Sequence, residues 1–536
     1  MLLSRLSASP CRSAALHNFF RASSYSTGPP KQRSGRRDQG GEDPTDRWNY
    51  NKSALLPTSV EDLVNIPSVT ANELEAEKQP PVGVKMLARD FIEDSLYNPN
   101  YGYFPKQATI FNTDTKPVDF SILRDSVEFQ ELIAQKYADY GSDKYEGPGR
   151  QIWHTPTELF KPYYAQAIAQ CLVSEYLLKY FPYEDFIIYE IGAGNGTLAM
   201  DILNYLQEFY PMVYERTRYN IIEISGSLVR QQKNKLYKAH PCAKVYHRSI
   251  FHWKTREPAP CYFVAMEVID NFAHDIVRYD LKTMQPYQGV VAITKEGDFD
   301  MVYTPITDPL ISSLLGIRAK LGHSPPVNKL LQSSSFLRSA YTNMPFAPNL
   351  SPEEYVPTRL LSLLRTLRTH FPRHRLLLSD FSSLPDTIPG VNAPVVQTRF
   401  RNTTIPCGTL LVKQGYFDIF FPTDFERLRD MYEYLLSQPL NPKSTADAIP
   451  SRSTPLVSTT SSLALGTDFF SSTYPQDRRT PLDGVASSSG LPVGERKSNV
   501  FTHAEFLETY ADLSKTRLRN GENPMLDFYK NVKFLF

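Results

Sequence analysis

Three glycines stand at a turn between a strand pattern and a helix pattern, and they are the strongest chemical signal in the sequence. The segment Glu190 to Leu198 reads Glu-Ile-Gly-Ala-Gly-Asn-Gly-Thr-Leu, directly after an apolar run. Glycines at such a turn allow positive φ and a close approach of the backbone to a ligand, and the following helix offers free N–H groups. The pattern predicts a ligand-binding loop, although a purely structural turn would use the same residues.

The spacing of the glycines indicates which ligand fits. A dinucleotide fingerprint needs Gly-x-Gly-x-x-Gly, and Thr197 stands where its third glycine would be. Gly-x-Gly-x-Gly after an acidic strand end instead fits the methionine and ribose of S-adenosylmethionine. Glu223 ends the next strand pattern, where an acidic residue can accept hydrogen bonds from ribose hydroxyls. The predicted cofactor site consists of Glu190, Gly192, Gly194, Gly196 and Glu223.

Two carboxylates follow a third strand pattern at its carboxyl end. Glu267 and Asp270 come directly after the apolar run 261–266, and ligands bind at this edge of open parallel sheets. A carboxylate there could orient a nitrogen nucleophile and take its proton, which a guanidinium with a pKa above ~12 needs before it attacks a methyl group. Glu267 is our first candidate catalytic residue and Asp270 our second. Two alternatives stay open: Glu267 contacts only the cofactor, and Asp270 caps a following helix.

No metal site is predicted from the sequence. The five cysteines form no Cys-x-x-Cys pair and no Cys/His cluster of zinc spacing. The histidines His154, His240, His247 and His252 form no ligand pattern, so each is interpreted as an ordinary surface or partly buried residue.

The elements that would position these residues alternate between strand and helix from residue 186 onward, which is typical of a parallel sheet. Strands are expected at 186–191, 219–224, 261–266 and 375–380, and helices at 196–209 and about 226–238. Earlier helices are predicted from about 84 to 96 and from just after Glu158 to about Phe181. The second would bury Phe160, Tyr164, Ala167, Ile168, Cys171, Leu172 and Leu178. The expected fold class is α/β, with a Rossmann-like core and helical additions.

Composition divides the chain into segments. Residues 1–37 are rich in Arg, Ser and Leu and contain no acidic residue, which is typical of a mitochondrial transit peptide, with a disordered basic tail as the alternative. The further segments are a flexible linker at 38–83, an N-terminal helical segment at 84–185, a core at 186–436 with a helical insertion at about 281–370, a disordered insertion at 437–497 and a closing segment of the core at 498–536.

Charge and hydropathy argue against two broad classes of protein. The 58 basic and 57 acidic side chains nearly cancel, so bulk electrostatics do not favour nucleic-acid binding. No window approaches the ~18 to 20 apolar residues of a membrane-spanning helix, so we expect no integral membrane segment.

Seven segments together resemble the MidA-like mitochondrial protein arginine methyltransferases, the NADH:ubiquinone oxidoreductase complex assembly factor seven family. They are Tyr97 to Phe104, Thr155 to Leu159, Glu190 to Thr197, Met266 to Asn271, Asp418 to Phe425, Glu505 to Leu507 and Met525 to Phe536. The sequence departs from the family pattern at three places. Thr157 is an extra residue before Glu158, Met266 replaces Asn, and Phe381-Ser382 replaces Tyr-Gly after Asp380. Segments 105–150 and 437–497 are enlarged, so the chain is interpreted as a divergent member.

The resemblance implies a class I methyltransferase core that uses S-adenosylmethionine, in the mitochondrial matrix. It also implies symmetric dimethylation of arginine in a respiratory complex I subunit during assembly, so the expected partner is a protein substrate. Two alternatives stay open, because fold does not imply function. One is a non-catalytic assembly or scaffold protein that retains the fold, and the other is a methyltransferase with a different mitochondrial target. The oligomeric state is not predicted.

Overall fold

The computed structural model describes most of the chain between residue 66 and the C-terminus. The described ranges are 66–107, 109–110, 117–140, 152–153, 155–345, 347–385, 392–400, 403–438 and 498–536. The transit peptide, most of the linker and nearly all of the disordered insertion lie outside these residues, and they stay predictions.

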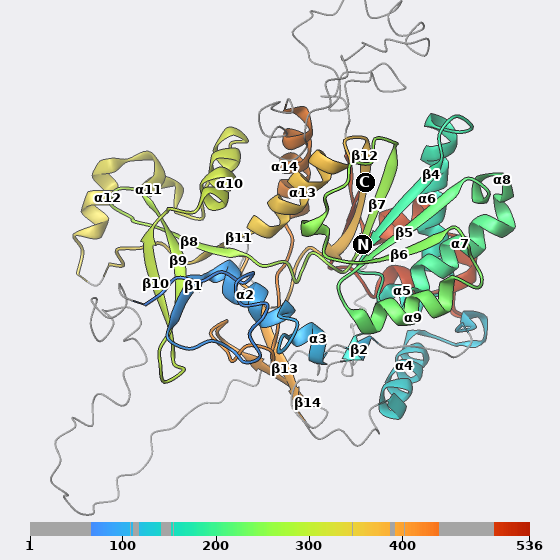
Figure 1. The fold of residues 1–536 in the computed structure, drawn as a ribbon, viewed down its shortest axis with the longest axis horizontal. Helices are drawn as coiled ribbons and strands as arrows, with labels where there is room; N and C mark the ends of the chain where they lie inside the picture. The colour runs from blue at the N-terminus through green and yellow to red at the C-terminus, as the bar shows by residue number, and fades with distance from the viewer. Residues whose placement is uncertain are drawn as a thin grey trace, which may run out of the picture.

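A seven-stranded sheet forms the part of the molecule on the right of Figure 1. Its strands are β4 (Phe186–Ile191), β5 (Thr217–Glu223), β6 (Ala243–His247), β7 (Cys261–Met266), β12 (His374–Phe381), β16 (Val500–Thr502) and β17 (Val532–Leu535). They lie in the order β16-β17-β12-β7-β4-β5-β6. Pairing is parallel from β12 through β6, and β17 is antiparallel to both of its neighbours. The predicted Rossmann-like α/β core is confirmed.

The strand order creates a switch point between β4 and β7. The chain first adds β5 and β6 on one side of β4 and then returns to add β7 and β12 on the other side. Ligands of open α/β sheets bind at the carboxyl ends of the strands on either side of such a reversal. The glycine loop leaves β4 and the Glu267 segment leaves β7, so the topology brings both to this point.

Helices cover both faces of this sheet. They are α5 (Pro156–Leu159), α6 (Tyr163–Lys179), α7 (Thr197–Phe209), α8 (Pro211–Tyr214), α9 (Gly226–Leu236), α13 (Thr358–His370), α14 (Phe425–Ser437), α16 (His503–Tyr510) and α17 (Pro524–Asp527). Successive residues of a strand point to opposite faces. Ile188 of β4 therefore packs in one core with α6 and α7, and its neighbours Ile187 and Tyr189 pack in another with α13 and α14. Burial on both faces explains the unbroken apolar run of β4.

The segment between β7 and β12 contributes to a second lobe, on the left of Figure 1. Its antiparallel sheet contains β1 (Val84–Leu87), β8 (Asp275–Tyr279), β9 (Pro286–Ile293), β10 (Phe299–Pro305) and β11 (Glu354–Val356). The helices nearby are α2 (Ala88–Tyr97), α10 (Pro309–Lys320), α11 (Lys329–Ser333) and α12 (Ser335–Thr342).

A three-stranded sheet completes this lobe, with β13 (Val395–Phe400), β14 (Thr403–Cys407) and β15 (Asp418–Phe420) in the order β14-β13-β15. The remaining elements are α3 (Tyr103–Gln107), β2 (Thr109–Ile110), α4 (Ser126–Tyr140), β3 (Ile152–Trp153) and the 3-10 turns η4 (Phe120–Ile122), η5 (Ile250–His252) and η7 (Leu513–Thr516).

Three predicted details are wrong. The first helix begins at Ala88 rather than near 84, because Val84–Leu87 pair with residues 290–293 of β9 as a strand. The insertion at about 281–370 is not purely helical, since β9, β10 and β11 lie within it and complete the second sheet. Leu178 does not face the core. It is 87% exposed, and the last three residues of α6, 177–179, are all exposed, whereas Tyr176 just before them is buried.

Candidate active site

The glycine loop connects β4 to α7 at the switch point. Gly192, Gly194 and Gly196 have φ of +68°, +51° and +70°, a region that favours glycine over other residues. A Cβ atom on Gly192 would lie 3.0 Å from Cγ2 of Val268. The loop therefore packs against the segment that follows β7, and its backbone conformation favours glycine.

Gln232 of α9 joins the glycine loop to Glu223 at the end of β5. Its Nε2 donates to the carbonyl oxygen of Gly194 at 2.8 Å and to Oε2 of Glu223 at 3.1 Å. The other carboxylate oxygen of Glu223 accepts a hydrogen bond from the N–H of Ser225 at 2.9 Å. Burial raises the pKa of Glu223 above its ordinary value. Each carboxylate oxygen accepts two hydrogen bonds, so Glu223 keeps acceptor capacity for ribose hydroxyls.

Glu190 lies near the end of β4, two residues before Gly192, and is 3% exposed. Its Oε2 accepts a hydrogen bond from the hydroxyl of Tyr219 at 2.8 Å. Burial raises the pKa of Glu190 to about 7, and the charge of Glu223 acts in the same direction. Glu190 is thus hydrogen-bonded to Tyr219 of the neighbouring strand β5, and direct contact between Glu190 and a cofactor stays a prediction.

Glu158 contacts the glycine loop, although the sequence suggested no specific role for it. Its Oε1 accepts hydrogen bonds from the hydroxyl of Thr197 at 2.7 Å and from Nδ2 of Asn195 at 3.2 Å. Thr155 caps α5 and so fixes Glu158 in its first turn. The carboxylate thereby ties α5 to the start of α7. The cap motif was a visible signal in the sequence, but nothing local indicated which loop would lie beside it.

Glu267 follows β7 directly and has a φ of +55°. Its N–H donates to the carbonyl oxygen of Ser379 at 2.8 Å, and its side chain is half-buried. Burial, together with the negative charge of Asp380, raises the pKa of Glu267 well above its ordinary value. A carboxyl group with a raised pKa is a stronger base once it has lost its proton, which suits proton abstraction.

Asp270 occupies a different environment from Glu267. It is 3% exposed, and its Oδ1 accepts a hydrogen bond from the N–H of Asn271 at 2.9 Å. Burial raises its pKa well above the ordinary value, and the charges of Asp380 and Asp418 add to this effect. Residues 271–274 form a turn that leads into β8 rather than a helix. The alternative that Asp270 caps a following helix is therefore wrong.

Asp380 at the end of β12 holds the segment that carries Glu267 and Asp270. Its Oδ2 accepts hydrogen bonds from the N–H groups of Val268, Ile269 and Asp270 at 3.1, 2.9 and 3.1 Å. Burial raises the pKa of Asp380 to about 7, while these bonds act in the opposite direction. The signal was available in the sequence, since Asp380 ends a strand pattern just as Glu223 does, but its contacts depend on the strand order.

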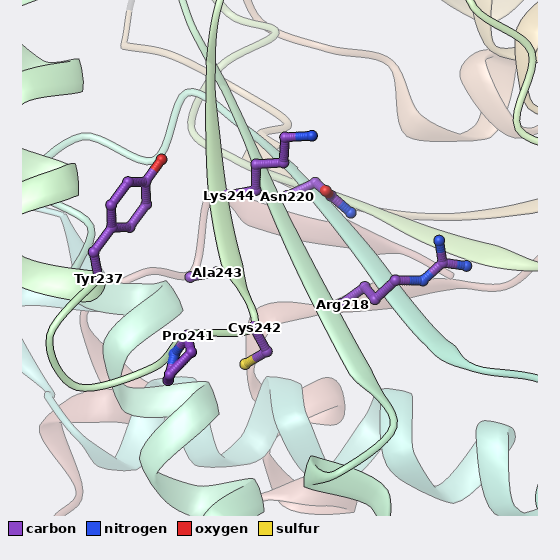
Figure 2. Close-up of a pocket in the computed structure, with 7 residues that line it drawn as sticks. All are labelled: Arg218, Asn220, Tyr237, Pro241, Cys242, Ala243 and Lys244. Carbon is purple, nitrogen blue, oxygen red and sulfur yellow. The ribbon is translucent and has the colours of Figure 1, made fainter.

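A pocket of about 570 Å³ lies elsewhere on the sheet, and Figure 2 shows its lining. The lining residues are Arg218, Asn220, Tyr237, Pro241, Cys242, Ala243 and Lys244. On β5 and β6 they occupy the amino-terminal halves, whereas Glu223 ends β5 at the opposite, carboxyl end. The pocket is therefore separate from the glycine loop.

The predicted interpretation of the histidines as surface or partly buried residues is wrong for His240, which is only 1% exposed, whereas His247 and His252 are exposed. His240 bonds to Tyr214 at 2.8 Å and to Asn204 at 3.0 Å, and exposed His247 lies 3.0 Å from the carbonyl oxygen of Ile224. His154 lies outside the described residues. Among the described residues, no group of three or more His, Cys, Asp or Glu side chains could hold a metal ion, and no helix is long and apolar enough to cross a membrane.

A protein-family model described as "Putative S-adenosyl-L-methionine-dependent methyltransferase" matches residues 167–440, more than half of the chain. The chain belongs to this methyltransferase family. The match spans β4, β5 and β7 and includes all five residues of the predicted cofactor site.

Two relatives carry the name "protein arginine methyltransferase NDUFAF7 homolog, mitochondrial". The relative from Schizosaccharomyces pombe is 27% identical over 335 residues, which cover 58% of this chain and 67% of the relative. The relative from Saccharomyces cerevisiae is 21% identical over 300 residues, which cover 51% of this chain and 65% of the relative, slightly under two thirds of its length. The resemblance predicted from the motifs is confirmed, as is the mitochondrial location.

Two solved structures from Burkholderia thailandensis are also similar. One is bound to S-adenosyl-homocysteine, with a TM-score of 0.42 and 17% sequence identity, and the alignment covers 70% of this chain and 78% of that one. The other is a native structure with a TM-score of 0.41 and 15% identity, covering 70% and 77% of the two chains.

The methyltransferase family uses S-adenosylmethionine, and the residues around the glycine loop fit this cofactor. The three loop glycines all have positive φ, which lets their backbone approach a ligand closely, and α7 begins directly after the loop without a side-chain cap on its first N–H groups. Glu223 would accept from the ribose hydroxyls, and the three glycines would adjoin the methionine part. When bound, S-adenosylmethionine supplies an electrophilic methyl group on a positively charged sulfur.

Proposed function

We propose that this methyltransferase acts on arginine side chains of a protein substrate and dimethylates them symmetrically. We further propose that the substrate is a respiratory complex I subunit, modified in the mitochondrial matrix during assembly. The names of the two relatives support arginine as the acceptor, and the family resemblance supports the complex I subunit. The alternatives are another mitochondrial target and a scaffold role without catalysis.

One observation carries the proposal of arginine chemistry, and it is the position of Glu267. This half-buried carboxyl group follows β7 at the switch point, and its neighbour Val268 packs against the glycine loop at Gly192. A base at this place would lie close to the cofactor loop, where an acceptor nitrogen must come to receive a methyl group. We therefore keep Glu267 as the proposed catalytic residue.

The chemistry follows from the charge of the acceptor. A guanidinium is a poor nucleophile because its lone pairs are delocalised and it stays protonated in water. The carboxylate of Glu267 would orient one guanidinium nitrogen through a charge-assisted hydrogen bond. It would receive the proton of that nitrogen as the N–C bond forms and the bond between the methyl group and sulfur breaks. Asp270 is buried behind this position, so we propose that it stays protonated and does not contact the substrate.

Mass spectrometry of mitochondrial proteins from cells with and without this protein tests the proposed function. We expect symmetric dimethylarginine to disappear from a complex I subunit in the deficient cells. The purified chain with labelled S-adenosylmethionine should then methylate an arginine peptide from that subunit and not the matched lysine peptide. Retained methylation in the deficient cells, together with no transfer in vitro, would favour the scaffold alternative. Loss of methylation on a different protein would favour another target.

A further inference from the structure

We propose that Asp380 is a positioning residue for methyl transfer, which fixes the backbone of the segment 267–270 and, through its charge, keeps Glu267 basic. The inference rests on the proposed role of Glu267 as the base. Asp380 would not contact substrate or cofactor, since its carboxylate is fully buried.

The backbone of Glu267 needs external support. A non-glycine residue at positive φ is disfavoured, so its neighbours must hold this conformation. Two successive residues at the end of β12 supply that support. Ser379 accepts the hydrogen bond from the N–H of Glu267, and Asp380 accepts those from the next three N–H groups, of Val268, Ile269 and Asp270. The carboxylate of Asp380 therefore fills the concave side of the turn that presents Glu267.

Asp380 also dominates the electrostatic environment of Glu267. Among the described residues, the titratable groups that interact with Glu267 are Asp380 on β12, Asp270 on its own segment and Tyr164 on α6. Burial holds the pKa of Tyr164 far above neutrality, so this side chain is uncharged. Four backbone N–H groups stabilise the charged form of Asp380, so its carboxylate is the first of the three acidic groups to lose its proton. Its charge then opposes ionisation of Glu267 and Asp270.

The pH dependence of methyl transfer tests the inference. Activity should rise with pH as Glu267 loses its proton. In Asp380→Asn the repelling charge is gone, so the pKa of Glu267 falls and the rising limb of kcat should move to lower pH by about one pH unit or more. The maximal kcat should also fall about tenfold or more, because the turn is less well fixed. Calorimetry should show S-adenosylmethionine binding within about twofold of wild type.

Asp418→Asn is the matched control. Asp418 is also buried and close to Asp270, but it bonds to the side chain of Asn271 rather than to the N–H groups of the turn. This variant should leave the rising limb in place. The inference would be overturned if the rising limb of the kcat–pH profile did not shift in Asp380→Asn, or if it shifted equally in Asp418→Asn.

A double variant separates positioning from general structural support. If Asp380 acts through Glu267, adding Asp380→Asn to Glu267→Gln should change kcat by less than about twofold, since the two effects are not independent. An additive loss would overturn the inference. If Asp380→Asn does not fold, Asp380→Glu replaces it. Glutamate keeps the negative charge, but its longer side chain places the carboxylate one methylene further from the backbone. We therefore expect a lower kcat and no shift of the rising limb of the kcat–pH profile.

A readout that needs no activity separates this inference from the proposed function. Carboxyl groups with raised pKa values make the folded state bind extra protons, so stability falls as pH rises through those values. The melting temperature of the wild-type chain should therefore fall between pH 6 and pH 9, and Asp380→Asn should show a flatter profile. If the melting temperature of Asp380→Asn depends less on pH but the wild-type chain methylates no arginine, the result counts against the proposed function alone. If its melting temperature depends on pH as in the wild type, the result counts against the inference.

Discussion

Glu267 and Asp270 are three residues apart, yet the fold places them in different environments. Glu267 is half-buried with no fixed side-chain partner described, whereas Asp270 is 3% exposed and accepts a hydrogen bond from the next N–H group. Both pKa values are raised, chiefly by burial. Two acidic groups in different environments can differ in which of them takes part in proton transfer. Accessibility therefore favours Glu267 as the group that meets a substrate.

The substitution Glu267→Gln tests this role directly. Glutamine keeps the size and shape of the side chain but removes the negative charge and the ability to accept a proton. Methyl transfer should fall by about 10²-fold or more, the usual scale for loss of a positioned base, while calorimetry shows unchanged S-adenosylmethionine binding. Equal losses in binding and transfer would instead make Glu267 a cofactor contact.

Glu257→Gln is the matched control for this substitution. Glu257 is half-buried near the opposite, amino end of the same strand, β7, and it bonds to Tyr189 and to the N–H of Ala259. It lies far along the strand from the switch point, so we expect transfer close to the wild-type rate. A comparable loss in Glu257→Gln would mean that the change is global rather than specific to the site.

The glycine loop depends on its backbone conformation as an element. In Gly194→Val, a β-branched side chain would have to adopt a φ of +51°, which costs about 1–2 kcal/mol in backbone strain, and it would occupy space beside the cofactor. We expect calorimetry to detect no S-adenosylmethionine binding, while circular dichroism shows a folded chain with a slightly lower melting temperature.

Gly297→Val serves as the comparison for the loop substitution. Gly297 also has positive φ, +91°, and no atom lies within 4 Å of the position of an added Cβ. It lies in the turn between β9 and β10, so it carries backbone strain without touching the loop. Similar loss of cofactor binding in both variants, or global unfolding of Gly194→Val, would show that the loop glycine is only a structural requirement.

Local pattern was sufficient for the glycine loop and for four strands of the main sheet, β4, β5, β7 and β12. It did not predict β6, β16 or β17, nor the contacts that hold the loop in place. The loop could be predicted because an apolar strand, three glycines and a helix follow one another within about 25 residues. The bonds from Thr197 to Glu158 and from Ile269 to Asp380 join residues 39 and 111 positions apart. Such pairs depend on strand order and helix placement, which a single sequence does not specify.

The misassigned first helix has the same cause. Val84 and Leu87 are compatible with one face of a helix, and Val84–Leu87 are equally compatible with a short strand. Pairing with residues 290–293 of β9 decides between them, and this partner lies about 200 residues further along the chain. Tertiary contact therefore overrides the local periodicity at this position.

At the scale of the whole molecule, Arg89 of α2 connects elements from several parts of the chain. Its guanidinium bonds to Asp275 at the start of β8 at 2.7 Å and to Asp308, which caps α10, at 2.8 Å. Thr358 at the start of α13 donates to the same carboxylate oxygen of Asp275 at 2.6 Å. Since α13 covers the main sheet and β8 belongs to the second lobe, this cluster helps to hold the two lobes together.

Replacing Arg89 by methionine should destabilise the chain in a pH-dependent way. Burial raises the pKa of Asp275 to about 6, and Arg89 opposes that rise. Without Arg89 the pKa of Asp275 rises further. At pH 8 the buried carboxyl group of Asp275 must then either stay charged without a cation or take up a proton, and either change lowers the free energy of unfolding. Removing one partner of a buried ion pair costs about 3–5 kcal/mol. At pH 5 the carboxyl group is protonated and needs no cation, so the loss should be clearly smaller.

Urea denaturation of Arg89→Met and wild type at pH 5 and pH 8 measures this difference. A carboxyl group with a raised pKa in the folded state contributes stability that is lost as pH rises through that pKa, and the variant should show the steeper loss. Arg124→Met is the control, because its ion pair with Glu128 is exposed on the surface and such pairs contribute little. Equal losses at the two pH values would mean that Arg89 acts through packing of its side chain, and that its charge does not hold the lobes together.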